Sequence, residues 1–249
     1  MRAGRIGGWG INACALRFGF VAARVVGVDA CRSGWVGVVL DQRSVSGCFG
    51  ATIAEVVVAA ESGGEVGVVG IDIPIGLPDC GERRADVLAC RLVGRRRSSV
   101  FMTPVRSAVE CVDHASAVRV NRGATGKGVS IQAFSLRARI LEVDAWVRQA
   151  ARKVVEVHPE VSFAVMAGAA LPHGKAVWAG FEHRLKLLDA AGITLAGNIG
   201  EVGGPARVDD VLDAAAAAWT ARRFAAGDAR SMPDPPEMFS DGLPCAIWV

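Results

Sequence analysis

Residues 25–40, VVGVDACRSGWVGVVL, decide the fold. Two short, β-branched apolar runs, 25–28 and 35–40, flank Ser33-Gly34, and this pattern predicts two strands joined by a tight connection. Asp29 directly follows the first run. Because burying an uncompensated carboxylate is costly, Asp29 is either a turn-former bonded to its own backbone or a ligand or catalytic acid at a strand end.

Later segments predict further strands and helices. Residues 65–78 (EVGVVGIDIPIGLP) predict a strand with Asp72 near its end, residues 153–160 (KVVEVHPE) one that ends in acids, and residues 46–53 a weaker one. Helical patterns cover 53–61, 82–94, 107–118, 131–150, 175–190 and 208–227. The glycine-rich segment 121–128 is expected to be a loop, and the tail from about residue 228 to be irregular, with a strand at 245–249.

The organisation of the chain predicts one domain over residues 25–249, preceded by a poorly ordered extension over residues 1–24. Arg17 interrupts the apolar part of the extension and no cleavage site follows, so we expect no signal peptide. No uninterrupted apolar stretch is long enough to span a bilayer. The seven cysteines form no CxxC pair, which argues against a disulfide framework or a zinc site and favours a cytoplasmic location.

The net positive charge of the chain is small, but its arginines are concentrated in one segment. The formal net charge is only +3, but between residues 83 and 106 the single acid Asp86 stands among seven arginines: Arg83, Arg84, Arg91, Arg95, Arg96, Arg97 and Arg106. Such a cluster either contacts phosphates or forms a solvated face. The chain has no tyrosine and few other aromatic residues, so we expect no base-stacking platform.

Carboxylates recur at the ends of predicted elements. In the helix over 208–227, Asp210 and Asp213 lie three residues apart and share a face, and the alanines after them allow close packing on a sheet. Asp209 or Asp210 suffices as a helix cap, whereas Asp213 is not needed for that role. If these acids converge with Asp29 and Asp72, their repulsion requires a divalent cation, and hard oxygen ligands suit Mg²⁺ or Mn²⁺.

The order of these features carries a resemblance. A hairpin with Asp at the end of its first strand, a later strand ending in an acid, and a last helix that opens DDVLDA together resemble the ribonuclease H-like fold, and this helix is similar to that of RuvC-type resolvases. The blocks GVDACRSGWV, GIDIPIGLP, RRADVLACRLVGRRRSSVFMTPVR, EVHPEVSF, GKAVWAGFEHRLKLL and DDVLDAAAAAWTARR resemble, in order, those of the DUF429 family from about residue 25 to 227. One departure is that Ala30 and Arg32 replace the glycine and proline usual in the first turn.

The resemblance implies an α/β fold with a mixed sheet, whose first three strands are antiparallel, flanked by helices. It implies a divalent-metal-dependent nuclease that hydrolyses phosphodiester bonds of DNA or RNA, with no membrane partner. The implied metal ligands are Asp29, Asp72, Asp210 and Asp213, and Glu160, rather than Glu156, is expected to complete the catalytic site. His158 is expected to be a structural hydrogen-bonding residue. The implied phosphate contacts are Arg83, Arg84, Arg91, Arg106 and Lys175.

Two alternatives stay open. Members of the acetate-kinase, sugar-kinase and actin group also open on a strand-end Asp, which would make the chain a phosphotransferase or nucleotide-binding protein. That group needs two related domains and a second phosphate-binding hairpin, whereas this sequence shows one domain and one hairpin. The other alternative is a non-catalytic binding module on the same fold.

Overall fold

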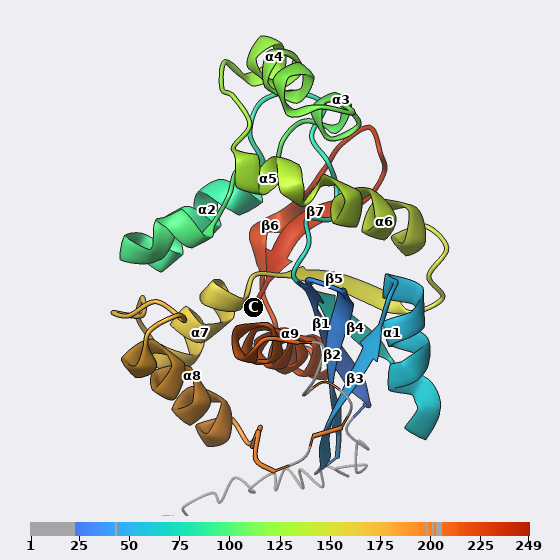
Figure 1. Ribbon diagram of the computed structural model, residues 1–249, viewed down its shortest axis with the longest axis vertical. Helices are drawn as coiled ribbons and strands as arrows, with labels where there is room; N and C mark the ends of the chain where they lie inside the picture. Colours follow the sequence, from blue (N-terminus) through green and yellow to red (C-terminus); the bar gives the residue numbers. More distant parts are fainter. Residues whose placement is uncertain (1–22, 43, 198, 201, 203–205) are drawn as a thin grey trace, which may run out of the picture.

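The computed structural model describes residues 23–42, 44–197, 199–200, 202 and 206–249. Its strands form a seven-stranded sheet in the order β3-β2-β1-β4-β5-β7-β6 (Figure 1). The strands are β1 (Val25–Cys31), β2 (Gly34–Asp41), β3 (Ser44–Gly50), β4 (Val68–Ile71), β5 (Lys153–Val157), β6 (Ser231–Met238) and β7 (Pro244–Trp248). β1, β2 and β3 are antiparallel, as are β6 and β7, whereas β1, β4, β5 and β7 run parallel. The predicted mixed α/β fold is confirmed, and it is consistent with a ribonuclease H-like architecture.

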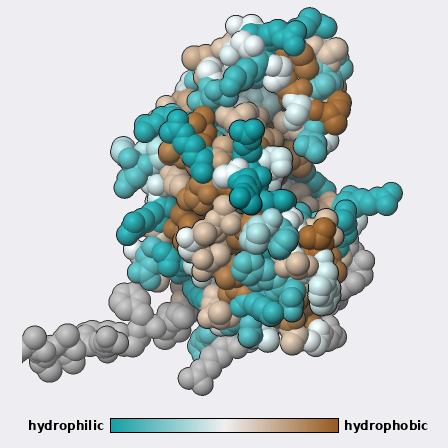
Figure 2. All heavy atoms as spheres, turned by 90° about the vertical axis from the view of Figure 1, so that its left-hand side faces the viewer, coloured by the Kyte–Doolittle hydropathy of each residue, from teal (hydrophilic) through white to brown (hydrophobic). Residues whose placement is uncertain are grey.

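Helices cover both faces of the sheet (Figure 1). They are α1 (Ile53–Ala60), α2 (Arg84–Val93), α3 (Arg106–Val109), α4 (His114–Thr125), α5 (Ile131–Ser135), α6 (Arg137–Val147), α7 (Pro159–Ala167), α8 (Trp178–Ala190) and α9 (Val208–Ala226), with 3-10 turns η1 (Glu61–Gly63) and η2 (Gly94–Ser99). α9 lies on one face beside α7 and α8, and α1 and α6 lie on the other (Figure 1). The side of the molecule that carries α2, α7 and α8 is largely hydrophilic, with apolar side chains between the polar ones (Figure 2).

The pleat of the sheet divides the core into two parts. Val25, Val36 and Val68 belong to the cluster on the α9 face, whereas Val26 and Ile71 belong to the cluster that α1 and α6 cover. This alternation follows from the two-residue period of a strand, and it fixes which side chains of β1 and β4 point toward α9.

The C-terminal tail agrees with the prediction at its end, where the strand expected over 245–249 is β7, but β6 takes the place of the irregular segment before it. β6 contains Pro233 and Pro235 and lies at the edge of the sheet, where a missing N–H costs no ladder bond. β7 fits between β5 and β6. The tail therefore completes the sheet.

Other boundaries differ as well: the predicted helix over 107–118 is divided into α3 and α4, and the predicted strand over 65–78 is shortened to β4. The predicted helix over 131–150 is divided at Leu136 into α5 and α6, and the segment predicted as a loop, 121–128, is helical as far as Thr125. The predicted strand over 153–160 ends at Val157, and α7 begins at Pro159, where proline fits because the first turn of a helix leaves its N–H groups unbonded.

The expected extension over residues 1–24 lies outside the described residues, except for Ala23 and Arg24. Arg24 belongs to the fold, because it pairs with Asp41 at 2.6 Å and donates to the Ala60 carbonyl. In the described part of the chain, no helix is long and apolar enough to cross a membrane.

Candidate active site at the carboxyl ends of the central strands

Asp29 and Asp72 are neighbours across the centre of the sheet. β1 and β4 are parallel with Val28 opposite Ile71, so Asp29 and Asp72 lie opposite each other one residue further toward the carboxyl ends of the strands. The Asp72 backbone N–H donates to the Val28 carbonyl at 3.1 Å and extends this pairing past the end of β4. Asp29 lies within β1 rather than after it, because the hairpin ladder continues to Cys31.

Close packing of α9 brings Asp213 to the same place. Gly27 and Gly70 face α9, and a Cβ atom on Gly27 would lie 1.9 Å from the Ala218 nitrogen and 2.1 Å from the Ala214 oxygen. The helix therefore rests directly on the strand backbones. Asp29 follows Gly27 by two residues on the same face, and Asp213 directly precedes Ala214, so the two carboxylates meet at one end of this contact.

Asp29, Asp72 and Asp213, which we call the acid cluster, line one cleft of about 330 Å³. Asp29 and Asp213 are buried, and Asp72 is half-buried. Burial raises the pKa of Asp29 well above its usual range, and the charges of Asp72 and Asp213 raise it further. Burial also raises the pKa of Asp72 to about 7 and, against the opposing charge of Lys175, that of Asp213 to about 6.

A lysine already compensates part of this charge. The Lys175 ammonium forms a short ion pair with Asp213 and lies 3.5 Å from Asp209. Although burial lowers it, the pKa of Lys175 is raised overall, because Asp213 and Asp29 favour the charged form. Lys175, predicted as a phosphate contact, is thus the internal counter-ion of the acid cluster.

The donor set suits a hard divalent cation. Among the described residues, no three His, Cys, Asp or Glu side chains converge into a ready metal-ion arrangement. The three members of the acid cluster nevertheless supply only carboxylate oxygens, and each has a raised pKa, so added positive charge is stabilised between them. Lys175 holds Asp213 in a contact that a metal ion would have to replace.

Asp210, the second helical acid, has a different role. Its carboxylate accepts a hydrogen bond from the Arg207 backbone N–H at 3.0 Å and so caps α9. It does not line the cleft, although its charge contributes to the raised pKa of Asp29.

Of the two glutamates considered, only Glu160 lines the cleft. Its carboxylate pairs with the buried Arg184 at 2.6 Å and lies 3.5 Å from Arg96. Glu156 pairs with Arg83 at 2.5 Å and accepts from the Ile75 backbone N–H at 2.7 Å. Both carboxylates therefore already have cationic partners.

Two of the arginines predicted to contact phosphate are structural. Arg83 is fully buried, which removes it from any nucleic-acid surface; it bonds Glu156 and Thr103 instead, because a buried guanidinium needs acceptors on all sides. Arg106 pairs with Asp144 and Asp241 at 2.9 and 2.8 Å. Arg84 and Arg91 are exposed on α2.

Three cleft residues have features that sequence reasoning did not assign. Arg96 lines the cleft from η2, and its buried Nε makes no hydrogen bond to a described residue but lies 3.5 Å from the Glu160 carboxylate. The His158 Nε2 lies 3.3 Å from the Ser99 carbonyl and must donate to it, which leaves the buried Nδ1 as an unpartnered acceptor among described groups. Burial lowers the pKa of His158, so the ring is neutral at pH 7. Gln132 reaches the cleft from α5.

The fold and site define a class: an α/β protein with a buried acid cluster and a lysine counter-ion at the carboxyl ends of parallel central strands. The chain belongs to the DUF429 family, described as proteins of unknown function, whose model matches residues 27–238. The resemblance to this family that the sequence carries is thereby confirmed. No curated protein and no solved structure matches the chain.

Proposed function

We propose that the chain is a nuclease that requires Mg²⁺ or Mn²⁺ and hydrolyses phosphodiester bonds of DNA or RNA. The observation that carries this proposal is the acid cluster: carboxylates from β1, from the end of β4 and from α9 share one cleft. Burial raises the pKa values of all three, and repulsion between the carboxylates raises those of Asp29 and Asp213 further. Asp29, Asp72 and Asp213 would hold the cation, and Asp210 would add negative charge behind them. A divalent cation bound there supplies a nucleophilic water at neutral pH and charge that stabilises the leaving oxygen.

The chain's own residues supply the remaining requirements. Lys175 lines the cleft, and its ammonium group can exchange its ion pair with Asp213 for one with a substrate phosphate. Arg96 lines the same cleft beside Glu160, and Arg91 and Arg84 lie exposed on the neighbouring α2. The neutral His158 has a free acceptor nitrogen at the cleft wall, where it can orient a water or a hydroxyl group.

A direct test measures cleavage of labelled single-stranded and duplex DNA and RNA with Mn²⁺, with Mg²⁺ and with EDTA. We expect metal-dependent cleavage that falls by at least about a thousandfold in Asp29→Asn, because the amide keeps the size of the side chain but removes its charge. Asp228→Asn, a change at an exposed aspartate outside the cleft, is the matched control and should keep full activity. Unchanged cleavage in Asp29→Asn would contradict the proposal.

The ion pair between Lys175 and Asp213 favours a second candidate, a binding module in which the lysine permanently takes the place of a metal ion. In that case no metal-dependent cleavage occurs, and the Lys175→Met protein unfolds more easily whether or not Mn²⁺ is present. For the nuclease, Mn²⁺ restores the stability that Lys175→Met removes, because a ligand that binds only the folded state stabilises it by mass action.

A further inference from the structure

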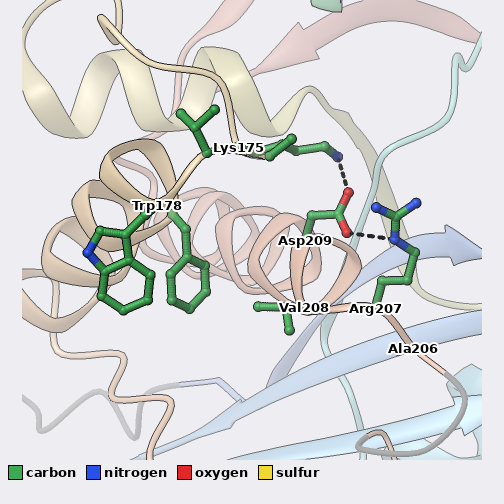
Figure 3. A pocket seen from close by; sticks show the side chains of 9 residues that line it. Lys175, Trp178, Ala206, Arg207, Val208 and Asp209 are labelled. Carbon is green, nitrogen blue, oxygen red and sulfur yellow. Dashed lines mark ion pairs between the residues drawn. The ribbon is translucent and has the colours of Figure 1, made fainter.

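A pocket of about 630 Å³ opens beside the acid cleft, between the first turn of α8 and the start of α9. Lys175 lines both cavities, so they are adjacent. In Figure 3, Trp178 lies at one side of this pocket and Arg207 at the other, and Lys175 and Arg207 both approach Asp209. The volume is within the range of about 300–1,000 Å³ typical of small-molecule sites, and a nucleotide unit fits this size.

The apolar wall of this pocket is unusual for a surface helix end. The Trp178 side chain is 74% exposed, although it is the largest apolar group at the start of α8. Phe181 supports it, with ring centroids 5.6 Å apart and an interplanar angle of 43°. Val177 and Val208 are also exposed at the pocket, so the indole face is part of a contiguous apolar lining.

Positive charge borders this lining on the side of the acid cleft. The Arg207 side chain is 78% exposed, and Lys175 is partly exposed. Arg96 continues the line, because it packs against Gly174, where an added Cβ atom would lie 2.7 Å from the guanidinium. Each of these cations has an acidic neighbour: Asp209 lies between Lys175 and Arg207, Asp213 pairs with Lys175, and Glu160 lies 3.5 Å from Arg96. Arg207 is the most exposed of the three, so its guanidinium is the most accessible to a phosphate.

We propose that this pocket binds an unpaired segment of a nucleic-acid strand, with one base stacked on Trp178 and the flanking phosphates held by Arg207, Lys175 and Arg96. The proposal rests on the proposed function and narrows its substrate to single strands or to duplexes with unpaired ends. An exposed indole stacks on any base face, so this binding needs no sequence readout. A regular duplex presents its bases only at its ends and cannot use the indole in this way.

The test measures binding of the protein by fluorescence anisotropy to three labelled probes: a twelve-nucleotide strand, a strand of the same length in which every position is abasic, and a blunt duplex. Each titration contains EDTA, so that no strand is cut. Three variants separate stacking from simple apolar contact: Trp178→Phe keeps a flat ring, whereas Trp178→Leu and Trp178→Ala do not. Val58→Ala, which alters another exposed apolar residue, on α1, is the control.

We expect the normal strand to bind more tightly than the abasic strand, and Trp178→Ala and Trp178→Leu each to weaken it about tenfold. Trp178→Phe should keep most of the affinity, and binding of the abasic strand and of the duplex should not change. Equal affinity of the unaltered protein for normal and abasic strands, no loss in Trp178→Ala, or an equal loss for all three probes would overturn the proposal. If the protein cleaves nucleic acid with metal but Trp178 does not contribute to binding, only the stacking proposal is refuted. If Trp178 contributes to binding but no cleavage occurs, only the proposed nuclease activity is refuted.

Discussion

Asp29 is the residue whose charge matters most to the acid cluster. It lies within β1, and its carboxylate accepts a hydrogen bond from the Ala30 backbone N–H at 2.8 Å. That bond is the local contact typical of a turn-former, yet the charges of Asp72 and Asp213 also bear on the same carboxylate. The interpretation as a turn-former and the interpretation as a cluster member thus both correspond to interactions of Asp29. A turn-former, however, needs no second carboxylate nearby, whereas a cation site does.

The raised pKa values predict how the stability of the metal-free protein depends on pH. In the folded state Asp29, Asp72 and Asp213 hold protons that an unfolded chain releases near a pKa of about 4. The folded state therefore binds more protons between about pH 4 and 7, and the free energy of unfolding falls as pH rises through this window. Asp29→Asn should flatten this dependence, because it removes one of the repelling groups.

Urea denaturation in EDTA at pH 5, 6, 7 and 8 measures this effect. Asp228→Asn, at an exposed site, is the control and should keep the slope of the unaltered protein. A free energy of unfolding that increases steadily from pH 5 to 8, or a slope that Asp29→Asn leaves unchanged, would show that the three carboxylates do not interact as described.

Among the elements, α9 does most to assemble the site, because it packs on Gly27 and Gly70 without intervening side chains. Gly27→Ala would place a methyl group against the backbone of α9, which must move away from β1. We expect a loss of about 3 kcal/mol or more in the free energy of unfolding. It should also lower the Mn²⁺ affinity, because Asp213 moves with the helix.

Gly123→Ala is the matched control for this prediction. Gly123 lies in α4, and nothing lies within 4 Å of the position that its Cβ would take. Alanine there should stabilise the protein by up to about 1 kcal/mol. If both changes had similar effects in denaturant titrations, the close approach of α9 to β1 would be wrong.

Local pattern was enough to predict the parts of the fold that depend on neighbouring residues. The hairpin, the strand that ends just before Asp72 and the tight packing of the alanine-rich helix all follow from short-range periodicity and residue size. The strand β6 was missed because an edge strand tolerates proline, and edge position is a property of the whole sheet.

The positions of the three cleft acids could be predicted from the sequence, but the residues that pair with them could not. Asp29, Asp72 and Asp213 end up in one cleft, as parallel strand ends and one helix face indicate. Their counter-ion comes from a loop: Lys175 is 38 residues from Asp213, and no local pattern links them. The exposed indole of Trp178 was missed for a similar reason, because exposure depends on what packs against the start of α8.

At the scale of the whole molecule, the arginines between residues 83 and 106 serve two purposes. Arg83 and Arg106 hold the fold together through buried or half-buried ion pairs, whereas Arg91, Arg95 and Arg97 are exposed around the end of α2. The exposed set lies next to Arg96, which reaches the acid cleft.

The exposed arginines should set the salt dependence of nucleic-acid binding. Replacing Arg91 and Arg95 by alanine should reduce the slope of log affinity against log salt concentration by about 1.4 for a single strand, because each phosphate contact there contributes about 0.7. Arg230→Ala, at an exposed arginine outside this segment, should not change the slope. A slope that the double variant leaves intact would place the phosphate contacts elsewhere.

The central claim is that the acid cluster is a site for a divalent cation and that Lys175 is its displaceable counter-ion. Titration of Mn²⁺ into the protein, followed by the electron paramagnetic resonance signal of free Mn²⁺, measures binding without any need for a substrate. The expected result is binding by the unaltered protein and by Asp228→Asn, tighter binding by Lys175→Met because no internal cation competes, and at least about tenfold weaker binding by Asp29→Asn. No binding by the unaltered protein at millimolar Mn²⁺, or equal binding by Asp29→Asn, would contradict the claim.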